Sequence, residues 1–387
     1  MSPLAARAAQ IEPFHVMEVV KQADALERAG RSVIHLSIGE PDFTATAPVQ
    51  RAAALAIEQA RTQYTPALGL PALCTRIAGW YATRYGVVVD PAAIAITAGA
   101  SGALLLACAA LVERDTEVLM PDPSYPCNRH FITAFEGRAR LVPTGPERRF
   151  QLDAACVEQN WGATTRGVLV ASPSNPTGTS IEASELAKVI TAVLARNGFV
   201  ISDEIYLGLS YDDIASTALA ISDQVIAINS FSKYFAMTGW RLGWVVMPPA
   251  LRPALERLAQ NLYICASAIA QHAALACFEP ESLAIYEERR AEFRRRRDFL
   301  VPALQQLGFG VPVRPDGAFY IYADIGHFSD DSDRFVEEVL MATGVCMVPG
   351  KDFGVHSPQR FVRISYATSY ERLLEAVERL QKYLLGR

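Results

Sequence analysis

The chain has 387 residues, 51% of them hydrophobic and 20% charged, which is the balance of a globular protein with room for two or three domains. The formal net charge of -5 argues against a nucleic-acid partner, which would usually leave an excess of basic residues. Seven cysteines without a C-x-x-C pair and six scattered histidines give no disulfide framework and no zinc-type spacing, so we expect no metal site.

No segment predicts a membrane anchor or a secretion signal. Residues 1–13 lack the apolar core of a signal peptide, and the most apolar run, 103–112, is too short to span a bilayer. We therefore expect a protein of the reducing cytoplasm without a membrane partner.

Short apolar segments alternate with helical patterns along the first three-quarters of the chain. This alternation indicates an α/β fold with a largely parallel sheet covered on both faces. Helices such as 101–111 and 183–197 are expected between the strands. The expected buried strands are 93–97, 117–120, 167–171, 199–202, 225–229 and 243–246.

From about residue 283 the pattern changes. A long charged helix is followed by short strands around 317–322 and 360–365 and by a closing helix from Tyr370, which predicts a smaller α+β domain. We place the large domain at 45–282 and the small domain at 1–44 and 283–387. The long helix carries six arginines, which alternate with glutamates in a helical pattern and so favour a solvated helix face over a binding patch: Arg289, Arg290 and Arg294 to Arg297.

Candidate chemical residues follow the ends of four predicted strands. Gly99 comes just after 93–97, Asn175 after 167–171, Asp203 after 199–202 and Ser230 after 225–229. Ligands of parallel sheets bind outside the carboxyl ends of the strands. We therefore expect these four residues to meet at one site.

Lys233 has the most informative surroundings of any lysine in the chain. It alone lies in an apolar, aromatic stretch, and a desolvated lysine readily becomes a neutral nucleophile that can form a Schiff base. The flanking Ser230 and Ser232, with Arg241 eight residues on, suggest a bound phosphate. An amine-reactive aldehyde that carries a phosphate is pyridoxal phosphate. The alternative is an ordinary lysine that extends its amine from a helix or loop to water.

These motifs together resemble the fold-type I, pyridoxal-phosphate-dependent aminotransferases of class I/II. The resemblance spans nearly the whole chain and implies a large domain with a mostly parallel seven-stranded sheet, bound pyridoxal phosphate, and a homodimer with shared active sites. The matching segments occur in the family's order: Gly39-Glu40-Pro41-Asp42-Phe43, Tyr64 with Gly69, Thr97-Ala98-Gly99-Ala100-Ser101, Pro121-x-x-x-Tyr125-Pro126, Ser174-Asn175-Pro176-Thr177-Gly178, Asp203-Glu204-Ile205-Tyr206, the Lys233 segment and Arg363.

The resemblance also implies how the phosphate is held. Gly99-Ala100-Ser101 opens a helix whose free N–H groups and dipole suit an anion, and Ser230, Ser232 and Arg241 would complete the cup. Tyr64 would reach the phosphate of the neighbouring subunit. The alternatives are an ordinary capped helix at Gly99 and a half-buried surface aromatic at Tyr64.

The remaining roles concern the cofactor ring and the substrate. By resemblance Asp203 faces the pyridine nitrogen, Asn175 and Tyr206 donate to the ring's 3-oxygen, and Tyr125 stacks on the ring. The alternatives are a helix cap for Asp203, a turn residue for Asn175 and core packing for Tyr125. Arg363 would clamp the substrate's α-carboxylate beside the backbone of Gly39, or else form a structural salt bridge.

The implied reaction moves an amino group from an L-amino acid to a 2-oxo acid by a ping-pong cycle. The catalytic residues would be Lys233, Asp203 and Tyr206. Alternatives are a C–S β-lyase or related Cα chemistry on the same site, and a non-catalytic ligand sensor.

The identity of the substrate is only weakly indicated. Arg129 is a candidate partner for a distal carboxylate because it lies near Tyr125 in sequence. A stretch with Phe14, His15 and Met17 could instead form an apolar lid, which would favour neutral or aromatic amino acids.

Overall fold

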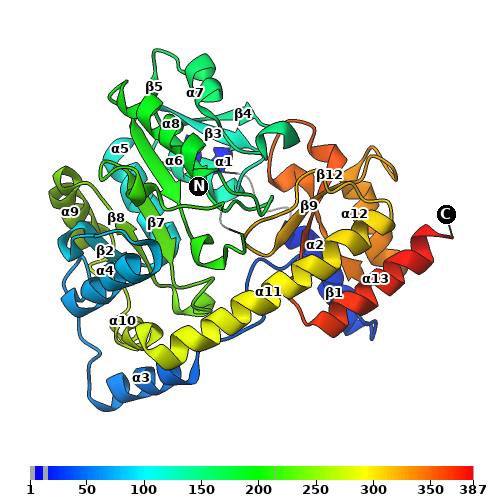
Figure 1. Ribbon diagram of the computed structural model, residues 1–387, viewed down its shortest axis with the longest axis horizontal. Helices are drawn as coiled ribbons and strands as arrows, with labels where there is room; N and C mark the ends of the chain where they lie inside the picture. Colours follow the sequence, from blue (N-terminus) through cyan, green and yellow to red (C-terminus); the bar gives the residue numbers. More distant parts are fainter. Residues whose placement is uncertain (1–4, 12–15, 213, 387) are drawn as a thin grey trace.

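The computed structural model describes residues 5–11, 16–212 and 214–386, and its largest element is a seven-stranded sheet (Figure 1). The strand order is β2-β8-β7-β6-β5-β3-β4, and β8 alone runs antiparallel to its neighbours. The expected α/β fold with a mostly parallel sheet is confirmed. The strands are β2 (Ile94–Thr97), β3 (Glu117–Asp122), β4 (Arg138–Pro143), β5 (Thr165–Ala171), β6 (Phe199–Asp203), β7 (Ile226–Ser230) and β8 (Gly243–Val246).

Six of these strands match expected segments, whereas no individual prediction covered β4. This strand lies at the sheet edge and pairs only with β3 among the described strands. Its side chains are mostly exposed or partly exposed, and Arg138 and Arg140 occupy alternate positions. An edge strand of this composition lacks the continuous apolar run that marks the central strands of a parallel sheet.

Helices cover both faces of the large sheet. Within β5, Val168 and Val170 pack in a cluster with α8, while Leu169 packs on the opposite face in a cluster with α5. This alternation explains why the strand reads as an uninterrupted apolar run. The helices around the large sheet are α3 (Ala47–Glu58), α4 (Pro71–Tyr85), α5 (Gly99–Leu111), α6 (Pro126–Ala134), α7 (Ala154–Asn160), α8 (Ala183–Leu194), α9 (Arg252–Leu262) and α10 (Ala268–Ala274).

A second, antiparallel sheet has the order β11-β12-β9, and a two-stranded parallel sheet joins β1 to β10. The long α11 runs from beside α3 and α10 to this second sheet (Figure 1). The elements of this region are α2 (Val16–Arg28), β1 (Ile34–His35), α11 (Pro280–Gln306), β9 (Tyr320–Asp324), α12 (Ser332–Thr343), β10 (Val345–Cys346), β11 (Val348–Pro349), β12 (Phe361–Ser365) and α13 (Tyr370–Leu384), and the short α1 (Ala6–Gln10) precedes them.

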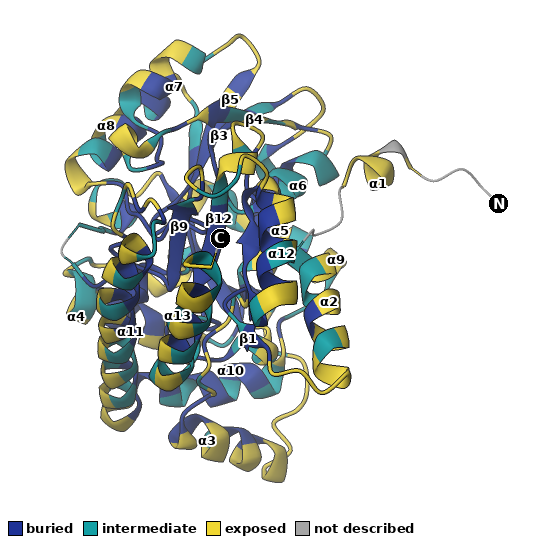
Figure 2. Cartoon of the chain, turned by 90° about the vertical axis from the view of Figure 1, so that its right-hand side faces the viewer, coloured by how far each residue is buried: buried dark blue, intermediate teal, exposed yellow. Residues whose placement is uncertain are grey.

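One hydrophobic cluster joins the two sheets. It contains Trp244 of β8, Phe293 of α11 and Phe319 beside β9, and all three side chains are buried. The buried interior therefore passes from one sheet to the other without a break, whereas the outer faces of α11 and α13 are exposed (Figure 2).

The expectation of a fully solvated arginine face on α11 is wrong for two residues. Arg296 and Arg297 are 4% and 1% exposed. Arg296 Nη1 lies 2.8 Å from Asp42 Oδ1, and Arg297 Nη1 lies 2.7 Å from Asp212 Oδ2. Buried charges require partners, and although Glu292 and Asp298 of α11 supply some of them, Asp42 and Asp212 come from segments that the local helical pattern does not contain.

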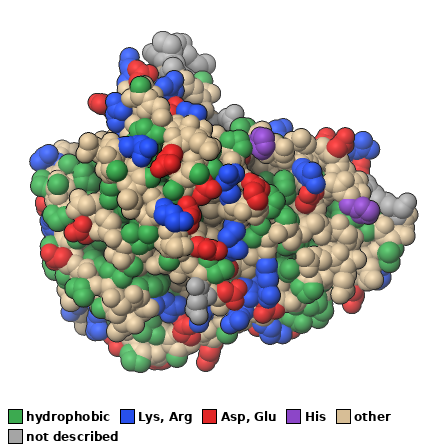
Figure 3. Space-filling model, turned by 45° about the horizontal axis from the view of Figure 1, so that its top comes forward, with side chains coloured by type: hydrophobic (Ala, Val, Ile, Leu, Met, Phe, Trp, Pro, Cys, Tyr) green, Lys and Arg blue, Asp and Glu red, His purple; other side chains and the backbone are tan. Residues whose placement is uncertain are grey.

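The surface carries charges of both signs. On the face shown in Figure 3, Lys and Arg side chains are interspersed with Asp and Glu rather than gathered into one basic stripe. Across the described ranges, no helix combines the length and the apolar character needed to cross a membrane.

Candidate active site

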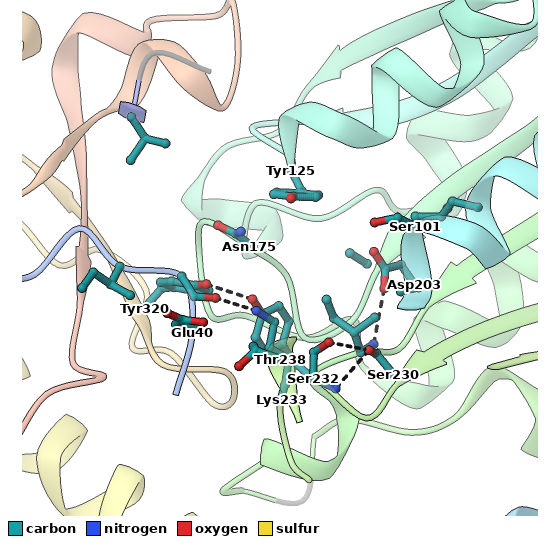
Figure 4. A pocket seen from close by; sticks show the side chains of 18 of the residues that line it. Glu40, Ser101, Tyr125, Asn175, Asp203, Ser230, Ser232, Lys233, Thr238 and Tyr320 are labelled. Atoms are coloured by element: carbon teal, nitrogen blue, oxygen red, sulfur yellow. Dashed lines mark hydrogen bonds between the residues drawn. The ribbon is translucent and has the colours of Figure 1, made fainter. Parts of the chain in front are cut away.

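A cavity of about 520 Å³ opens at the carboxyl ends of the parallel strands, between the large sheet and the β9–β12 pair (Figure 4). Strands β6 and β7 contribute Asp203 and Ser230, while β9 and β12 contribute Tyr320 and Arg363. Two expected residues, Gly99 and Tyr64, are not among those that line it. The expected residues that the cavity brings together are Gly39, Ala100, Ser101, Tyr125, Asn175, Asp203, Tyr206, Ser230, Ser232, Lys233, Arg241 and Arg363.

Lys233 presents its amine to the interior of this cavity. Its Nζ donates a 2.5 Å hydrogen bond to the carbonyl oxygen of Gly39 and lies 5.6 Å from the ring centre of Tyr206. Burial lowers the pKa of the Lys233 amine to about 8, although the nearby Glu40 carboxylate opposes the shift. A substantial fraction of this amine is therefore neutral near pH 7.5 and able to attack a carbonyl carbon.

An anion-binding cup lies at the start of α5. The N-terminus of this helix has no capping side chain, so its first N–H groups are available to a ligand. Gly99 adopts φ +72°, and a Cβ at this position would lie 2.7 Å from Arg241 Nη2. Glycine thus lets the guanidinium approach the helix end. Ser230 and Ser232 add two hydroxyls to the cavity wall, and Ser230 Oγ donates to Ser232 Oγ at 3.0 Å. This donor set fits a phosphate group.

Asp203 is a buried carboxylate held by two donors. The backbone N–H of Ile205 lies 3.3 Å from Oδ1, and Asn128 Nδ2 lies 3.4 Å from Oδ2. Burial raises the pKa of Asp203 to about 6, while these hydrogen bonds oppose the shift. Asp203 is therefore mostly ionised at pH 7 and can pair with a protonated ring nitrogen, so the cavity fits pyridoxal phosphate at this end as well.

Asn128 was not anticipated from the sequence. It follows Tyr125 by three residues, so both lie at the start of α6 on the same side of the helix. The three-residue spacing indicates this neighbourhood only if Tyr125 is the N-cap of a helix, as it is here.

Arg363 is 4% exposed and has no carboxylate partner among the described residues. Its Nη1 donates to Asn175 Oδ1 at 3.0 Å, and its Nη2 donates to the carbonyl oxygen of Ser37 at 2.7 Å. The guanidinium carbon lies 4.6 Å and 4.8 Å from the ring centres of Tyr320 and Phe353. Within the described residues Nε is buried without a partner. An orphaned charged donor at a cavity wall fits a carboxylate ligand better than a structural salt bridge.

Tyr206 forms a hydrogen bond with a second phenol that the sequence did not reveal. Its hydroxyl lies 2.8 Å from that of Tyr320, and both side chains are buried. The two residues are 114 positions apart in the chain, so no local motif connects them.

The two candidates for substrate selection differ in position. Arg129 is not among the described residues that line the cavity, whereas Met17 lines it together with Val16 and Val20 of α2. The backbone N–H of Val16 donates to Asp352 Oδ2 at 2.6 Å and so ties the start of α2 to the small-sheet region. Phe14 and His15 lie outside the described residues.

Two further observations concern residues outside the cavity. Tyr64 is 80% exposed, on the segment between α3 and α4. In the described part of the chain, one group has the spacing of metal ligands: Asp24, Glu27 and His35, of which the two carboxylates are exposed.

Comparisons with known proteins agree with this geometry. Residues 31–380 match the family "Aminotransferase class I and II". The chain is 39% identical to a valine–pyruvate aminotransferase of Mycobacterium tuberculosis over 99% of both chains. The structure also resembles a crystal structure of an aminotransferase from that organism, with a TM-score of 0.96 and 39% sequence identity. The match covers 100% of both chains. The aspartate aminotransferase of Thermus thermophilus with maleate has a TM-score of 0.93 and 32% identity, with 99% of this chain and 100% of that chain covered.

Proposed function

The chain belongs to the class I and II aminotransferases, which use pyridoxal phosphate to transfer amino groups, and we propose that it acts on an uncharged, mainly apolar L-amino acid and a 2-oxo acid. The charges around the cavity carry this proposal. Once Lys233, Asp203, Arg241 and Arg363 are assigned to cofactor and α-carboxylate, the remaining charged residue among those that line the described cavity is Glu40. An anionic side chain would meet a like charge there.

Apolar groups form the wall that would face the substrate side chain. Val16 and Val20 of α2 line the cavity together with Ile38, and these side chains offer no donor to a distal carboxylate. The relative from Mycobacterium tuberculosis is named for valine and pyruvate, whose side chains are uncharged, which supports the same class for this chain.

The proposed roles in the reaction follow from the positions of the side chains. When bound, pyridoxal phosphate supplies an electron-accepting ring that stabilises the electron pair left at the amino acid's Cα. The start of α5 would hold the phosphate, with Gly99, Ala100, Ser101, Ser230, Ser232 and Arg241 as the proposed contacts. Asp203 would keep the ring nitrogen protonated, Tyr125 would stack on the ring, and Asn175 and Tyr206 would contact its 3-oxygen.

Lys233 is the proposed proton carrier. Arg363 and the backbone of Gly39 would hold the α-carboxylate and so orient the Cα–H bond toward Nζ of Lys233. The neutral amine would accept that proton as a general base, and the ammonium so formed would donate it to the cofactor carbon that takes the amino group; two such half-reactions make a ping-pong cycle.

A panel of amino acids tests the substrate class. We expect a higher kcat/KM for valine and alanine than for aspartate and glutamate. Glu40→Gln removes the opposing charge and should raise the ratio of acidic to neutral kcat/KM about tenfold, roughly the effect of 1.4 kcal/mol in a partly solvated site. Using a ratio cancels any change in the Lys233 pKa, because both substrates share that amine.

Glu18→Gln is the matched control, because Glu18 lies on α2 but pairs with Lys21 in solvent and does not line the cavity. It should leave the ratio unchanged. A wild-type preference for aspartate that Glu40→Gln does not alter would refute the substrate class while leaving the aminotransferase activity intact.

We also propose a cytoplasmic homodimer with shared active sites, in which 45–282 form the large domain and 1–44 with 283–387 form the small one. Tyr64 is highly exposed, and Leu55 and Ile57 of α3 expose apolar surface nearby in sequence. Such exposed apolar groups suit a subunit interface.

Tyr64→Phe tests the shared site. The variant lacks the hydroxyl that would donate a hydrogen bond to the charged phosphate, so cofactor retention should weaken about tenfold or more. Dissociation is measured by dialysis and absorbance, and the mass in solution should be twice the chain mass of 42.2 kDa. Tyr370→Phe, at the start of α13, is the control and should retain the cofactor normally. A monomer, or unchanged retention in Tyr64→Phe, would contradict sharing.

A further inference from the structure

The phenol pair of Tyr206 and Tyr320 joins the two sheets at the cavity. Tyr206 follows β6 of the large sheet, whereas Tyr320 is the first residue of β9 in the small sheet. Their hydroxyls are 2.8 Å apart, and their rings meet edge to face with centres 5.7 Å apart. Tyr320 is fully buried and lines the cavity. Its hydroxyl therefore lies at the cavity wall and away from bulk solvent (Figure 4).

We propose that Tyr320 is a positioning residue whose hydroxyl donates to Tyr206 and thereby directs the single proton of Tyr206 toward the bound cofactor. This inference rests on the proposed contact between Tyr206 and the cofactor's 3-oxygen. It adds a residue from the small sheet to the groups that control the proton affinity of the cofactor.

The number of protons decides the direction of this hydrogen bond. Each phenol has one O–H to donate, and geometry alone allows either to be the donor. If Tyr206 donates to an oxygen in the cavity, it cannot also donate to Tyr320. Tyr320 must then be the donor in the pair. A hydroxyl that accepts a hydrogen bond becomes a stronger donor itself, so Tyr320 strengthens the bond that Tyr206 makes.

The ring of Tyr320 has a second neighbour at the carboxylate end of the cavity. The guanidinium of Arg363 lies over the ring at 4.6 Å, and Arg363 also contacts Asn175. On the other side, a Cβ at Gly39 would lie 3.2 Å from the Tyr320 hydroxyl, so this backbone approaches the phenol closely. Tyr320 thus packs against the proposed carboxylate clamp with its ring and bonds to Tyr206 with its oxygen.

Tyr320→Phe separates these two contacts, because it keeps the ring and removes the oxygen. The measurement is a pH titration of the absorbance of the bound cofactor in the purified holoenzyme. Weaker donation to the 3-oxygen destabilises its negative charge, so the apparent pKa of the cofactor should rise by about half a unit to one unit. The KM for the amino acid should change less than twofold, because the ring beneath Arg363 remains.

Tyr206→Phe and the double variant complete the experiment. Tyr206→Phe should raise the apparent pKa at least as much as Tyr320→Phe, and the double variant should match Tyr206→Phe alone, because Tyr320 acts through Tyr206. Tyr322→Phe is the matched control: it removes a buried phenol oxygen from the same strand, outside the cavity, and should leave the titration unchanged.

Each outcome separates this inference from the proposed function. A shift in Tyr206→Phe with a normal titration in Tyr320→Phe overturns the inference and leaves the role of Tyr206 standing. Additive shifts in the double variant also overturn it, because Tyr320 would then act independently. A normal titration in Tyr206→Phe removes Tyr206 from the cofactor and refutes both.

Discussion

Replacing Lys233 with alanine is expected to lower turnover by about four orders of magnitude, which is the upper range for loss of a general base. The variant loses both the amine that would hold the cofactor and the group that would accept the Cα proton. No other lysine replaces it, because Lys233 is the only lysine among the described residues that line the cavity. The measurement is the rate of the amino-acid half-reaction, read from the absorbance of the cofactor.

Reduction with borohydride provides a second readout of the same variant. Wild-type protein should gain the mass of the cofactor covalently, whereas Lys233→Ala should not. Lys188→Ala is the control, since Lys188 pairs with Glu185 on the exposed side of α8 and should keep full activity. Covalent labelling of the Lys233→Ala protein would mean that another amine holds the cofactor, and the proposed site would be wrong.

Replacing Arg363 with lysine is expected to raise the KM for the amino acid about a hundredfold, because truncating a buried, hydrogen-bonded charge pair costs roughly 2–5 kcal/mol. Lysine keeps the charge but loses the planar fork that binds both carboxylate oxygens. It also loses the paired hydrogen bonds to Asn175 and Ser37 that fix the plane of the guanidinium. Cofactor affinity should change little, since Arg363 is not among the proposed phosphate contacts.

Arg360→Lys is the matched control for this variant. Arg360 immediately precedes β12, the strand that carries Arg363, but its guanidinium is exposed and pairs with Asp324 outside the active-site cavity. Its KM should equal that of the wild type. A normal KM in Arg363→Lys would exclude a bidentate carboxylate contact, and the orphaned Nε would then need another ligand.

Local chemistry made much of this cavity predictable from the sequence. The segment with Ser230, Ser232 and Lys233 predicts a phosphate-bearing aldehyde, because an amine and two hydroxyls lie within four residues of one another. Asp203 and Ser230 follow buried strands whose apolar runs are plain, so their convergence at one edge of the sheet follows from parallel pairing. The structure places all of these residues on the wall of one cavity.

Contacts between distant segments could not be predicted in this way. Tyr320 reaches Tyr206 across 114 residues, and Asn128 reaches Asp203 across 75. Arg297 pairs with its neighbour Asp298 but also with Asp212, which lies in a loop far from α11 in the sequence. Each of these pairs is decided by how the sheets pack together, which no periodicity within one element records.

The unbroken interior that links Trp244, Phe293 and Phe319 limits how the catalytic chamber can open. Separating the large sheet from the β9–β12 sheet would expose these buried aromatic rings to water, at a cost of roughly 1.5–3 kcal/mol for each ring. Helix α2 buries less of its surface: Ala23 is its one buried residue, Val19 and Leu26 pack partly buried beside it, and the backbone N–H of Val16 donates to Asp352. We therefore expect the packing of α2, rather than separation of the two sheets, to limit access to the cavity.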